Sequence, residues 1–249
     1  MSGDAIALEL EGVTRRFGGL VALDQVSFSV RTGEVVGVIG PNGAGKSTLF
    51  EVISGGIGLS AGSIRYFGED LSPLAPHERR RAGLSRTFQK IRLFNGLTVE
   101  QNVQVAAQQS SGSRWREQVD SALRRMRLSS IAARKPDELT LADRKRVEIA
   151  RAIVGRCRLL MLDESLCGLT HEEARELVGE VLALNRQDGV TILVVEHVMP
   201  IVMSMAERLV VLDHGCVIAD ALPDEVAHNP EVVRAYLGGK QVAALREPI

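Results

Sequence analysis

This chain of 249 residues has few cysteines and no long apolar run. Its three cysteines, Cys157, Cys167 and Cys216, are odd in number and form no C-x-x-C motif. Such spacing argues against a disulfide framework or a zinc site and favours ordinary buried thiols in a reducing compartment. The most apolar window, residues 190–205, contains charged residues and a proline, so it falls short of the roughly 20 apolar residues of a membrane span. We therefore expect no segment to cross a bilayer by itself.

The chain also lacks an excess of charge and a secretion signal. It carries 30 basic and 31 acidic residues, and its formal net charge of −1 favours no nucleic-acid partner, although local charged patches remain possible. Residues 1–10 have no basic start followed by a long apolar core, which indicates a cytoplasmic protein. Because 45% of the residues are hydrophobic, we expect a well-buried core in one large domain or two small ones.

The most specific pattern in the chain is a G-x-x-x-x-G-K-[ST] motif between two predicted elements. It comprises Gly40, Pro41, Asn42, Gly43, Ala44, Gly45, Lys46, Ser47 and Thr48. The apolar run at residues 35–39 is typical of a buried parallel strand, and the amphipathic segment 48–53 predicts a helix. The glycines let successive N–H groups turn toward a phosphate, and the helix adds the positive end of its dipole. The motif therefore predicts a phosphate loop.

Two side chains of this motif have defined roles in phosphate loops. Lys46 would lie against the β- and γ-phosphates of a nucleotide, and the Ser47 hydroxyl would ligate Mg²⁺. The alternative is a glycine-rich turn that carries an exposed lysine. The complete motif, placed between a strand and a helix, favours the phosphate loop over that alternative.

Ionisable residues follow two further apolar runs. Residues 159–162 end at Asp163 and Glu164, and residues 191–195 are followed closely by His197. Ligands of parallel sheets bind beyond the carboxyl ends of the strands, so these side chains are expected in one site. Asp163 can hold Mg²⁺, directly or through water, Glu164 can polarise the attacking water, and His197 can sense the γ-phosphate. The alternatives are helix-capping acids and a structural histidine.

Alternating apolar and polar residues at 6–11 and 26–30 predict two strands of a small antiparallel layer. Phe17 falls between them in a predicted loop, residues 15–19, where its ring would be exposed. Near a nucleotide pocket such a ring can stack on the base, and anchoring of the loop in the core is the alternative. Further elements are expected at residues 63–67 (strand), 171–187 (helix), 208–213 and 215–219 (paired strands) and 231–237 (helix).

The middle of the chain is rich in arginine. Residues 74–92 and 114–135 carry most of these basic side chains, and the second segment has apolar residues at helical spacing, such as Val119, Leu123 and Met126. The pattern predicts a helical insertion with a basic outer face. Such a face is solvated by default, while anionic lipid headgroups or a partner surface are the alternatives.

The order and separation of these motifs resemble the ATP-binding subunit of ABC transporters over nearly the whole chain. The resemblance implies that Phe17 stacks on adenine, that residues 40–48 are the Walker A loop and that residues 159–163 are Walker B. It further implies a catalytic base at Glu164 and the H-loop histidine at His197. Gln89 stands at the Q-loop, which in the family links Mg²⁺ and the attacking water to the membrane subunit.

The signature motif departs from the family pattern. Where the family usually has Leu-Ser-Gly-Gly-Gln, residues 139–143 read Leu-Thr-Leu-Ala-Asp. In the family this motif caps the γ-phosphate bound by the opposite subunit of a head-to-tail dimer. Thr140 can still donate a hydroxyl, but Ala142 carries a Cβ where glycine is usual, and Asp143 adds negative charge near a polyanion. We therefore expect weaker ATP-driven dimer closure than with the usual motif.

Smaller departures follow Walker B, and other stretches indicate a branch of the family. Ser165 stands where proline is usual, and Thr170 stands where the D-loop commonly has aspartate, so the contact between subunits is affected. Residues 86–103, 194–199 and 229–238 resemble importers for branched-chain and other hydrophobic amino acids, including their amide and urea relatives.

Together, these observations predict an α/β protein with a P-loop NTPase parallel-sheet core, an antiparallel β layer and an inserted α-helical subdomain. We expect one ABC ATPase domain, with its core at about residues 1–85 and 157–237, the helical subdomain at about 86–156 and a tail at 238–249.

The resemblance also implies the ligands and partners. ATP and Mg²⁺ are the expected ligands. The expected partners are transmembrane permease subunits contacted near Gln89, a second ATP-binding subunit, identical or different, and indirectly a solute-binding protein. The chain would then lie on the cytoplasmic face of the cell membrane. A soluble ABC ATPase that serves as an assembly scaffold is the alternative, and a nucleic-acid-handling ABC protein is disfavoured by the near-zero charge and the single phosphate loop.

Overall fold

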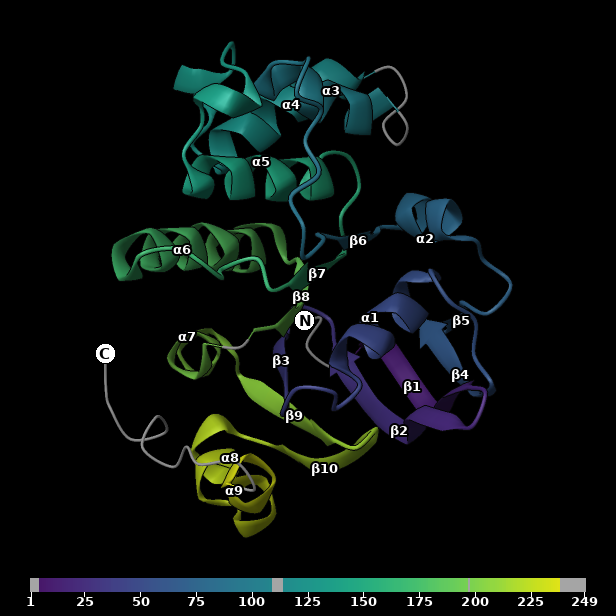
Figure 1. Cartoon of the computed structure of the whole chain (residues 1–249). Coiled ribbons are helices and arrows are strands. Elements are labelled where there is room, and N and C mark those ends of the chain that lie inside the picture. Colours follow the sequence, from purple (N-terminus) through teal and green to yellow (C-terminus); the bar gives the residue numbers. More distant parts are fainter. Residues whose placement is uncertain (1–4, 109–113, 197, 238–249) are drawn as a thin grey trace.

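The computed structural model describes residues 5–108, 114–196 and 198–237. They fold into two sheets with helices packed on them and a group of helices at one end (Figure 1). In this part of the chain, no helix combines the length and the apolar composition of a membrane span.

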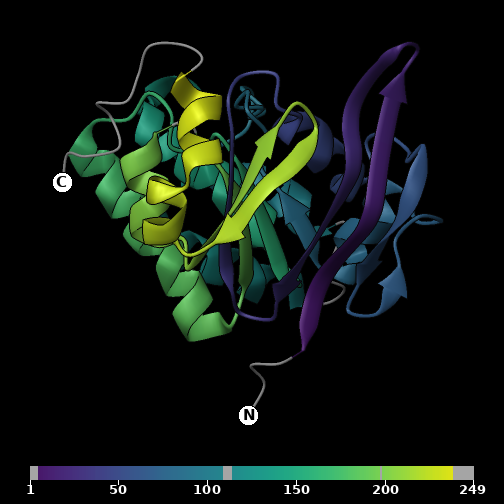
Figure 2. The same ribbon diagram turned by 90° about the horizontal axis from the view of Figure 1, so that it is seen from below.

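The first sheet is antiparallel, with the strand order β2-β1-β4-β5. Its strands are β1 (Ile6–Phe17), β2 (Leu20–Arg31), β4 (Ala61–Tyr66) and β5 (Glu69–Asp70). β1 and β2 form a long hairpin along one side of the molecule (Figure 2). Alternate residues of β1, such as Leu8 and Leu10, are buried because successive side chains of a strand point to opposite faces. The predicted antiparallel layer is confirmed, and β5 is a strand that the sequence did not indicate.

The second sheet is mainly parallel, with the strand order β10-β9-β3-β8-β7-β6. Its strands are β3 (Val35–Ile39), β6 (Leu84–Arg86), β7 (Leu159–Asp163), β8 (Thr191–Val195), β9 (Arg208–Asp213) and β10 (Cys216–Ala221). Only β10 runs antiparallel to its neighbour. Every residue of β3, β7 and β8 is buried, as expected for strands covered on both faces. Since β3, β7 and β8 are parallel, their carboxyl ends meet at one edge of the sheet.

The helix after the phosphate loop lies between the two sheets. It is α1 (Lys46–Ser54), and its buried residues Leu49, Phe50 and Ile53 share one apolar cluster with strands of both sheets. Helix α2 (Pro76–Ala82) packs at the end of α1. Two other apolar clusters hold α6 (His171–Asp188), α7 (Met199–Met205), α8 (Pro223–His228) and α9 (Pro230–Leu237) against the parallel sheet. Because both layers hold α1, the start of this helix and the loop before it have a fixed position.

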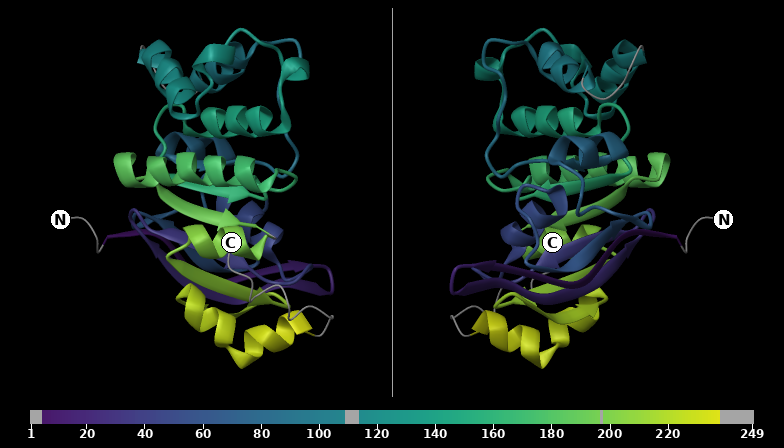
Figure 3. Two further views of the ribbon diagram at one scale, coloured as in Figure 1. Left: turned by 90° about the vertical axis from the view of Figure 1, so that its left-hand side faces the viewer. Right: turned by 90° about the vertical axis from the view of Figure 1, so that its right-hand side faces the viewer.

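A group of helices forms the end of the molecule above α6 (Figure 3). It consists of α3 (Val99–Gln108), α4 (Trp115–Arg125), α5 (Leu141–Ile153) and two short 3₁₀ helices, Ser129–Ile131 and Pro136–Glu138. Val119, Leu123 and Met126 are buried, as their helical spacing predicts. This group leaves the sheet after β6 and returns to it at β7, close to the predicted limits of the helical subdomain at residues 86 and 156.

The predicted basic outer face is wrong for three arginines of the segment 74–92. Arg79 is buried, and its guanidinium donates to the carbonyls of Val52 and Ile53 at 2.8 Å each, at the end of α1. Arg80 donates to the carbonyl of Val154 at 2.7 Å, and Arg86 lies inside the candidate site. Arginine has five donors and a long apolar stem, so it can satisfy buried carbonyls that composition alone does not reveal.

The expectation of buried thiols is only partly correct. Cys157 is half-buried, whereas Cys167 and Cys216 are exposed, and all three are free. Burial raises the pKa of the Cys157 thiol. The expectation failed because Cys167 lies in the loop after β7 and Cys216 begins the edge strand β10, where neither is covered.

Candidate active site

The phosphate loop requires glycine at two of its positions. Gly40 has a φ of 149°, and a Cβ there would lie 2.1 Å from the carbonyl oxygen of Leu212. Gly45 has a φ of 105°, and its Cβ would lie 2.6 Å from the carbonyl oxygen of Ala22. Gly45 precedes α1 and caps it without a side chain, so the backbone N–H groups of the first helical turn remain available for an anion.

Lys46 lies inside the curl of this loop. It is only 5% exposed, and its Nζ donates to the carbonyls of Gly40 at 2.6 Å and Pro41 at 2.9 Å. Burial lowers the pKa of Lys46, and the negative charge of Glu164 opposes that shift. The ammonium group is therefore held at the loop, and its contact with a phosphate stays a prediction.

Asp163 is the last residue of β7, and its carboxylate is buried. Only one of its two oxygens has a hydrogen-bond partner among the described residues. Its Oδ2 accepts a bond of 2.7 Å from Arg86, and its backbone N–H donates to the hydroxyl of Thr87 at 3.1 Å. Its Oδ1 is buried and has no hydrogen-bond partner among the described residues. A carboxylate oxygen left without a donor suits a hard cation such as Mg²⁺, and the exposed Ser47 of the phosphate loop can add a hydroxyl ligand. These residues fit the predicted metal.

Arg86 is a functional residue that the sequence reasoning placed on the outer face. Its guanidinium joins Asp163 to Glu51 of α1, with NH1 2.8 Å from the Glu51 Oε1, and its side chain is only 8% exposed. Its position follows from β6 (Leu84–Arg86), which pairs with β7, but the sequence Leu-Ser-Arg gives no clear strand signal.

Glu164 and Gln89 meet at the mouth of the loop. The Gln89 Nε2 donates to the Glu164 Oε2 at 2.6 Å, so the structure brings together two residues that are 75 positions apart in the sequence. Glu164 has a φ of 49°, a conformation that side chains seldom adopt. Its N–H donates to the Val195 carbonyl at 2.9 Å, which ties this turn to the end of β8.

A cleft of about 550 Å³ joins these groups. It is lined by residues of the phosphate loop and by Phe17, Gln89, Glu164 and His214. Its size is within the range of small-molecule sites, and its polar groups converge at the phosphate loop. It therefore has room for a nucleotide whose phosphates lie on the loop.

Phe17 lines the same cleft as Glu164. The predicted loop is corrected here, because Phe17 is the last residue of β1 and the turn follows at residues 18–19. The ring is 44% exposed, and the Arg15 guanidinium lies over it with its carbon 4.5 Å from the ring centre. An exposed ring fixed at a strand end offers a flat surface for a base.

His214 also lines the cleft, and the sequence reasoning missed it. It stands in the turn between β9 and β10, with a φ of 45° and a side chain that is 94% exposed. The turn is tied to the phosphate loop, since the N–H of Gly215 donates to the Ala44 carbonyl at 3.1 Å. β9 is parallel to β3, so its polar end could have been assigned to the same edge from the topology. His197, by contrast, lies outside the described residues.

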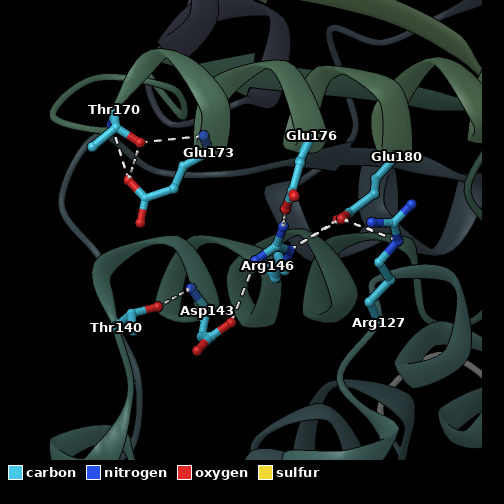
Figure 4. A network of polar contacts seen from close by, with 8 residues as sticks. All are labelled: Arg127, Thr140, Asp143, Arg146, Thr170, Glu173, Glu176 and Glu180. Atoms are coloured by element: carbon cyan, nitrogen blue, oxygen red, sulfur yellow. Dashed lines mark hydrogen bonds and ion pairs between the residues drawn. The ribbon is translucent and has the colours of Figure 1, made fainter.

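The signature residues lie at the start of α5 rather than in this cleft (Figure 4). The Thr140 hydroxyl caps the helix by accepting from the N–H of Asp143 at 3.1 Å. Ala142 is buried, at 3% exposure, whereas Leu141 is 41% exposed. The Cβ of Ala142 therefore packs within the subunit. Ala142 can still offer a ligand its backbone N–H, because it lies in the first turn of α5.

The chain belongs to the ABC transporter ATP-binding family. The family model described as "ABC transporter" matches residues 23–166, and a second, "Branched-chain amino acid ATP-binding cassette transporter", matches residues 216–241. The matched ranges contain the phosphate loop, Gln89, Asp163 and Glu164. The site and the fold thus define an ATPase of this class.

Individual proteins of this family are similar to the chain over most of its length. The chain is 37% identical to the high-affinity branched-chain amino acid transport ATP-binding protein BraF of Pseudomonas aeruginosa, over 93% of this chain and 97% of that one. The ADP conformation of MJ1267, an ATP-binding cassette of an ABC transporter, superposes with a TM-score of 0.85 at 31% identity, over 94% of this chain and 99% of that one.

A dimeric cassette is also similar in fold. The post-hydrolysis state of MJ0796 bound to ADP and Pi has a TM-score of 0.76 at 25% identity and covers 87% of this chain and 98% of that one. The P-loop NTPase fold predicted from the sequence is therefore confirmed by both solved cassettes.

Proposed function

We propose that this chain is the ATP-hydrolysing subunit of a multi-subunit importer for branched-chain or other hydrophobic amino acids, or for amide- and urea-like solutes. The observation that carries the proposal is the bond of 2.6 Å between Gln89 and Glu164 at the mouth of the phosphate-loop cleft. This bond supports a pair in which Glu164 would be the base and Gln89 the sensor, since both line the cleft beside the phosphate loop. The similarity to BraF supports the class of solute.

Hydrolysis would proceed by in-line attack of water on the γ-phosphate. Glu164 would orient and polarise the water, and the Gln89 amide would hold that carboxylate in place. Lys46 and the N–H groups at the start of α1 would stabilise the charge that develops on the phosphate. Mg²⁺, bound by Ser47 and Asp163, would neutralise the phosphate charge, and Gln89 would contact it as well. His197 would contact the γ-phosphate, as the resemblance implies.

The working unit would be a head-to-tail dimer of ATP-binding subunits. In such a dimer the start of α5, with Thr140 and Ala142, caps the nucleotide held by the opposite phosphate loop. The exposure of Thr140 and Leu141 supports this role, because this end of α5 is open for a partner. The dimeric structure of the cassette MJ0796 supports a dimer by similarity.

The membrane subunits would dock beside Gln89. A second cavity, of about 450 Å³, opens between the core and the helical group, and Phe88, Arg92 and Arg151 help to line it. Phe88 is 46% exposed, so an apolar surface is available next to the Gln89 region, beside several arginines and the carboxylates Glu51 and Glu148. A helix of a permease subunit with apolar and acidic residues suits it, and this contact would hold the chain on the cytoplasmic face of the membrane. A solute-binding protein would act only through the permease.

Reconstitution with the permease subunits tests the proposal. Vesicles that contain the complex, with ATP on the side of this chain, should take up labelled leucine when a solute-binding protein is supplied. The Glu164→Gln variant should bind ATP but support no uptake, which is the matched control. Uptake of an amide or urea in place of leucine would change the assigned solute. ATP hydrolysis without any uptake, in a chain that does not bind the permease subunits, would instead support the scaffold alternative.

A further inference from the structure

One buried arginine holds three carboxylates between α5 and α6 (Figure 4). The Arg146 Nε contacts both carboxylate oxygens of Glu180 at 3.1 Å, its NH2 contacts Glu176 at 2.9 Å, and its NH1 contacts Asp143 at 3.4 Å. The Arg146 side chain is 11% exposed and that of Glu180 only 3%. A single planar group thus joins the signature helix to the helix that follows Walker B.

The carboxylates of this cluster differ in how many cations they contact. Glu180 has a second cation, Arg127, at 3.6 Å, but Asp143 pairs with Arg146 alone among the ion pairs of the described residues. The Asp143 side chain is 22% exposed, and it stands in the first turn of α5, three residues after Thr140. Without Arg146, its carboxylate would be a free negative charge at the end of the helix.

That end of α5 is where the proposed dimer would bring the triphosphate of the opposite subunit. A free carboxylate close to a polyanion would oppose closure, because like charges repel more strongly where water is excluded. The guanidinium pairs with the Asp143 carboxylate from the same helix, and it offsets part of that charge because its single positive charge is shared with Glu176 and Glu180. The same arginine fixes α5 to α6, whose own start is held by the Thr170 cap, with the Glu173 N–H donating to the Thr170 hydroxyl at 3.3 Å.

We propose that Arg146 is a positioning residue that pairs with Asp143, offsets part of its negative charge and thereby makes a carboxylate in the signature segment compatible with the nucleotide of the partner subunit. The inference rests on the proposed head-to-tail dimer. Only arginine suits this role, since its planar fork can contact three carboxylates at once, whereas a lysine is a single point charge.

ATP-driven association of the Glu164→Gln protein, measured by sedimentation, tests the inference. Adding Arg146→Lys keeps a cation beside Glu180 but removes the fork, and it should weaken association by about tenfold, which corresponds to about 1.4 kcal/mol. Adding Asp143→Asn as well should restore most of that loss. The benefit of Asp143→Asn should be much larger in combination with Arg146→Lys than beside the native arginine, which is the coupling that a double-mutant cycle measures.

A second set of variants separates a loss of association from a folding defect. The pair Arg146→Gln and Glu180→Gln removes the buried charges together, and it should show the same loss of association and the same recovery with Asp143→Asn. Arg127→Gln, which takes a cation from Glu180 without touching Asp143, is the matched control and should leave association unchanged.

The possible outcomes distinguish a failure of the Arg146 inference from a failure of the proposed dimer. Association that Arg146→Lys weakens and Asp143→Asn restores supports the inference. Association that falls with Arg146→Lys but is not restored by Asp143→Asn reveals a merely structural role and overturns it. Association that is equally tight with and without the Arg146 fork overturns it as well. A Glu164→Gln protein that associates in the presence of ATP neither with itself nor with a different ATP-binding subunit overturns the head-to-tail dimer, and the inference falls with it.

Discussion

Replacing Arg86 by methionine should destabilise the nucleotide-free protein strongly. The substitution keeps the apolar stem but leaves the Asp163 carboxylate, whose side chain is 4% exposed, without its cation. Breaking a buried ion pair by removing one partner costs about 3–5 kcal/mol, because the remaining charge is neither paired nor hydrated. The second pair of Arg86, with the 40% exposed Glu51, adds less than about 1 kcal/mol. The loss therefore comes mainly from Asp163.

Urea unfolding without nucleotide measures this effect. For a chain of this size each kcal/mol lowers the melting temperature by roughly 2–4 °C, so thermal unfolding should shift by roughly 10 °C. Arg125→Met is the matched control, since Arg125 lies 2.6 Å from Asp188 but the two side chains are 44% and 27% exposed. That variant should lose less than about 1 kcal/mol.

A double variant checks the cause of the loss. Arg86→Met combined with Asp163→Asn removes both charges, so it should regain much of the stability while losing Mg²⁺-dependent hydrolysis. The reasoning is refuted if Arg86→Met is no more costly than Arg125→Met. It is also refuted if the double variant is less stable than Arg86→Met alone.

Three further substitutions test other parts of the site. Phe17→Ala should weaken ATP binding, measured by titration calorimetry, by about 1–3 kcal/mol, which is the contribution of one stacked base. Phe17→Trp should keep the affinity for ATP, because it keeps an aromatic ring. Gly40→Ala should cost more than about 2 kcal/mol in urea, because its Cβ would lie 2.1 Å from the Leu212 carbonyl oxygen, whereas Gly19→Ala meets no atom within 4 Å and should be tolerated. Thr170→Ala should lose about 1 kcal/mol with the cap of α6, and Thr170→Ser should keep it; equal stability of the two would contradict the capping role.

Most of the fold and the phosphate site follow from local patterns in the sequence. The strand Val35–Ile39, the glycines and Lys46 form one continuous segment whose geometry depends little on the rest of the chain. The apolar runs of β7 and β8 likewise reveal fully buried strands, and their carboxyl ends share an edge. For these reasons the carboxylates at the end of β7 could be assigned to the phosphate loop before the structure was known.

The burial of the arginines could not be read from the sequence. Arg86 is buried because β6 pairs with β7, and Arg79 is buried because α2 packs at the end of α1. Both facts depend on contacts between segments far apart in the chain, whereas a local run of arginines is typical of a solvated surface. Composition therefore predicts burial least well for long side chains with many hydrogen-bond donors, such as arginine.

The signature segment shows the same limit. The expectation of weaker dimer closure stays a prediction, but its premises change, since Ala142 is buried within the subunit and Asp143 is paired with Arg146. The carboxylates that fix this arginine come from α6, about 30 residues later. Helical spacing alone cannot show which neighbour a charged side chain will find.

The most direct test of the account is ATP hydrolysis by the purified chain as a function of its concentration, alone and then with a second ATP-binding subunit and the permease. We predict a rate per molecule that rises steeply as subunits associate and vanishes with Glu164→Gln, since each site needs its own carboxylate and the α5 end of a partner. Activity that is independent of concentration under all these conditions, or that survives Glu164→Gln, would contradict the proposed dimeric ATPase.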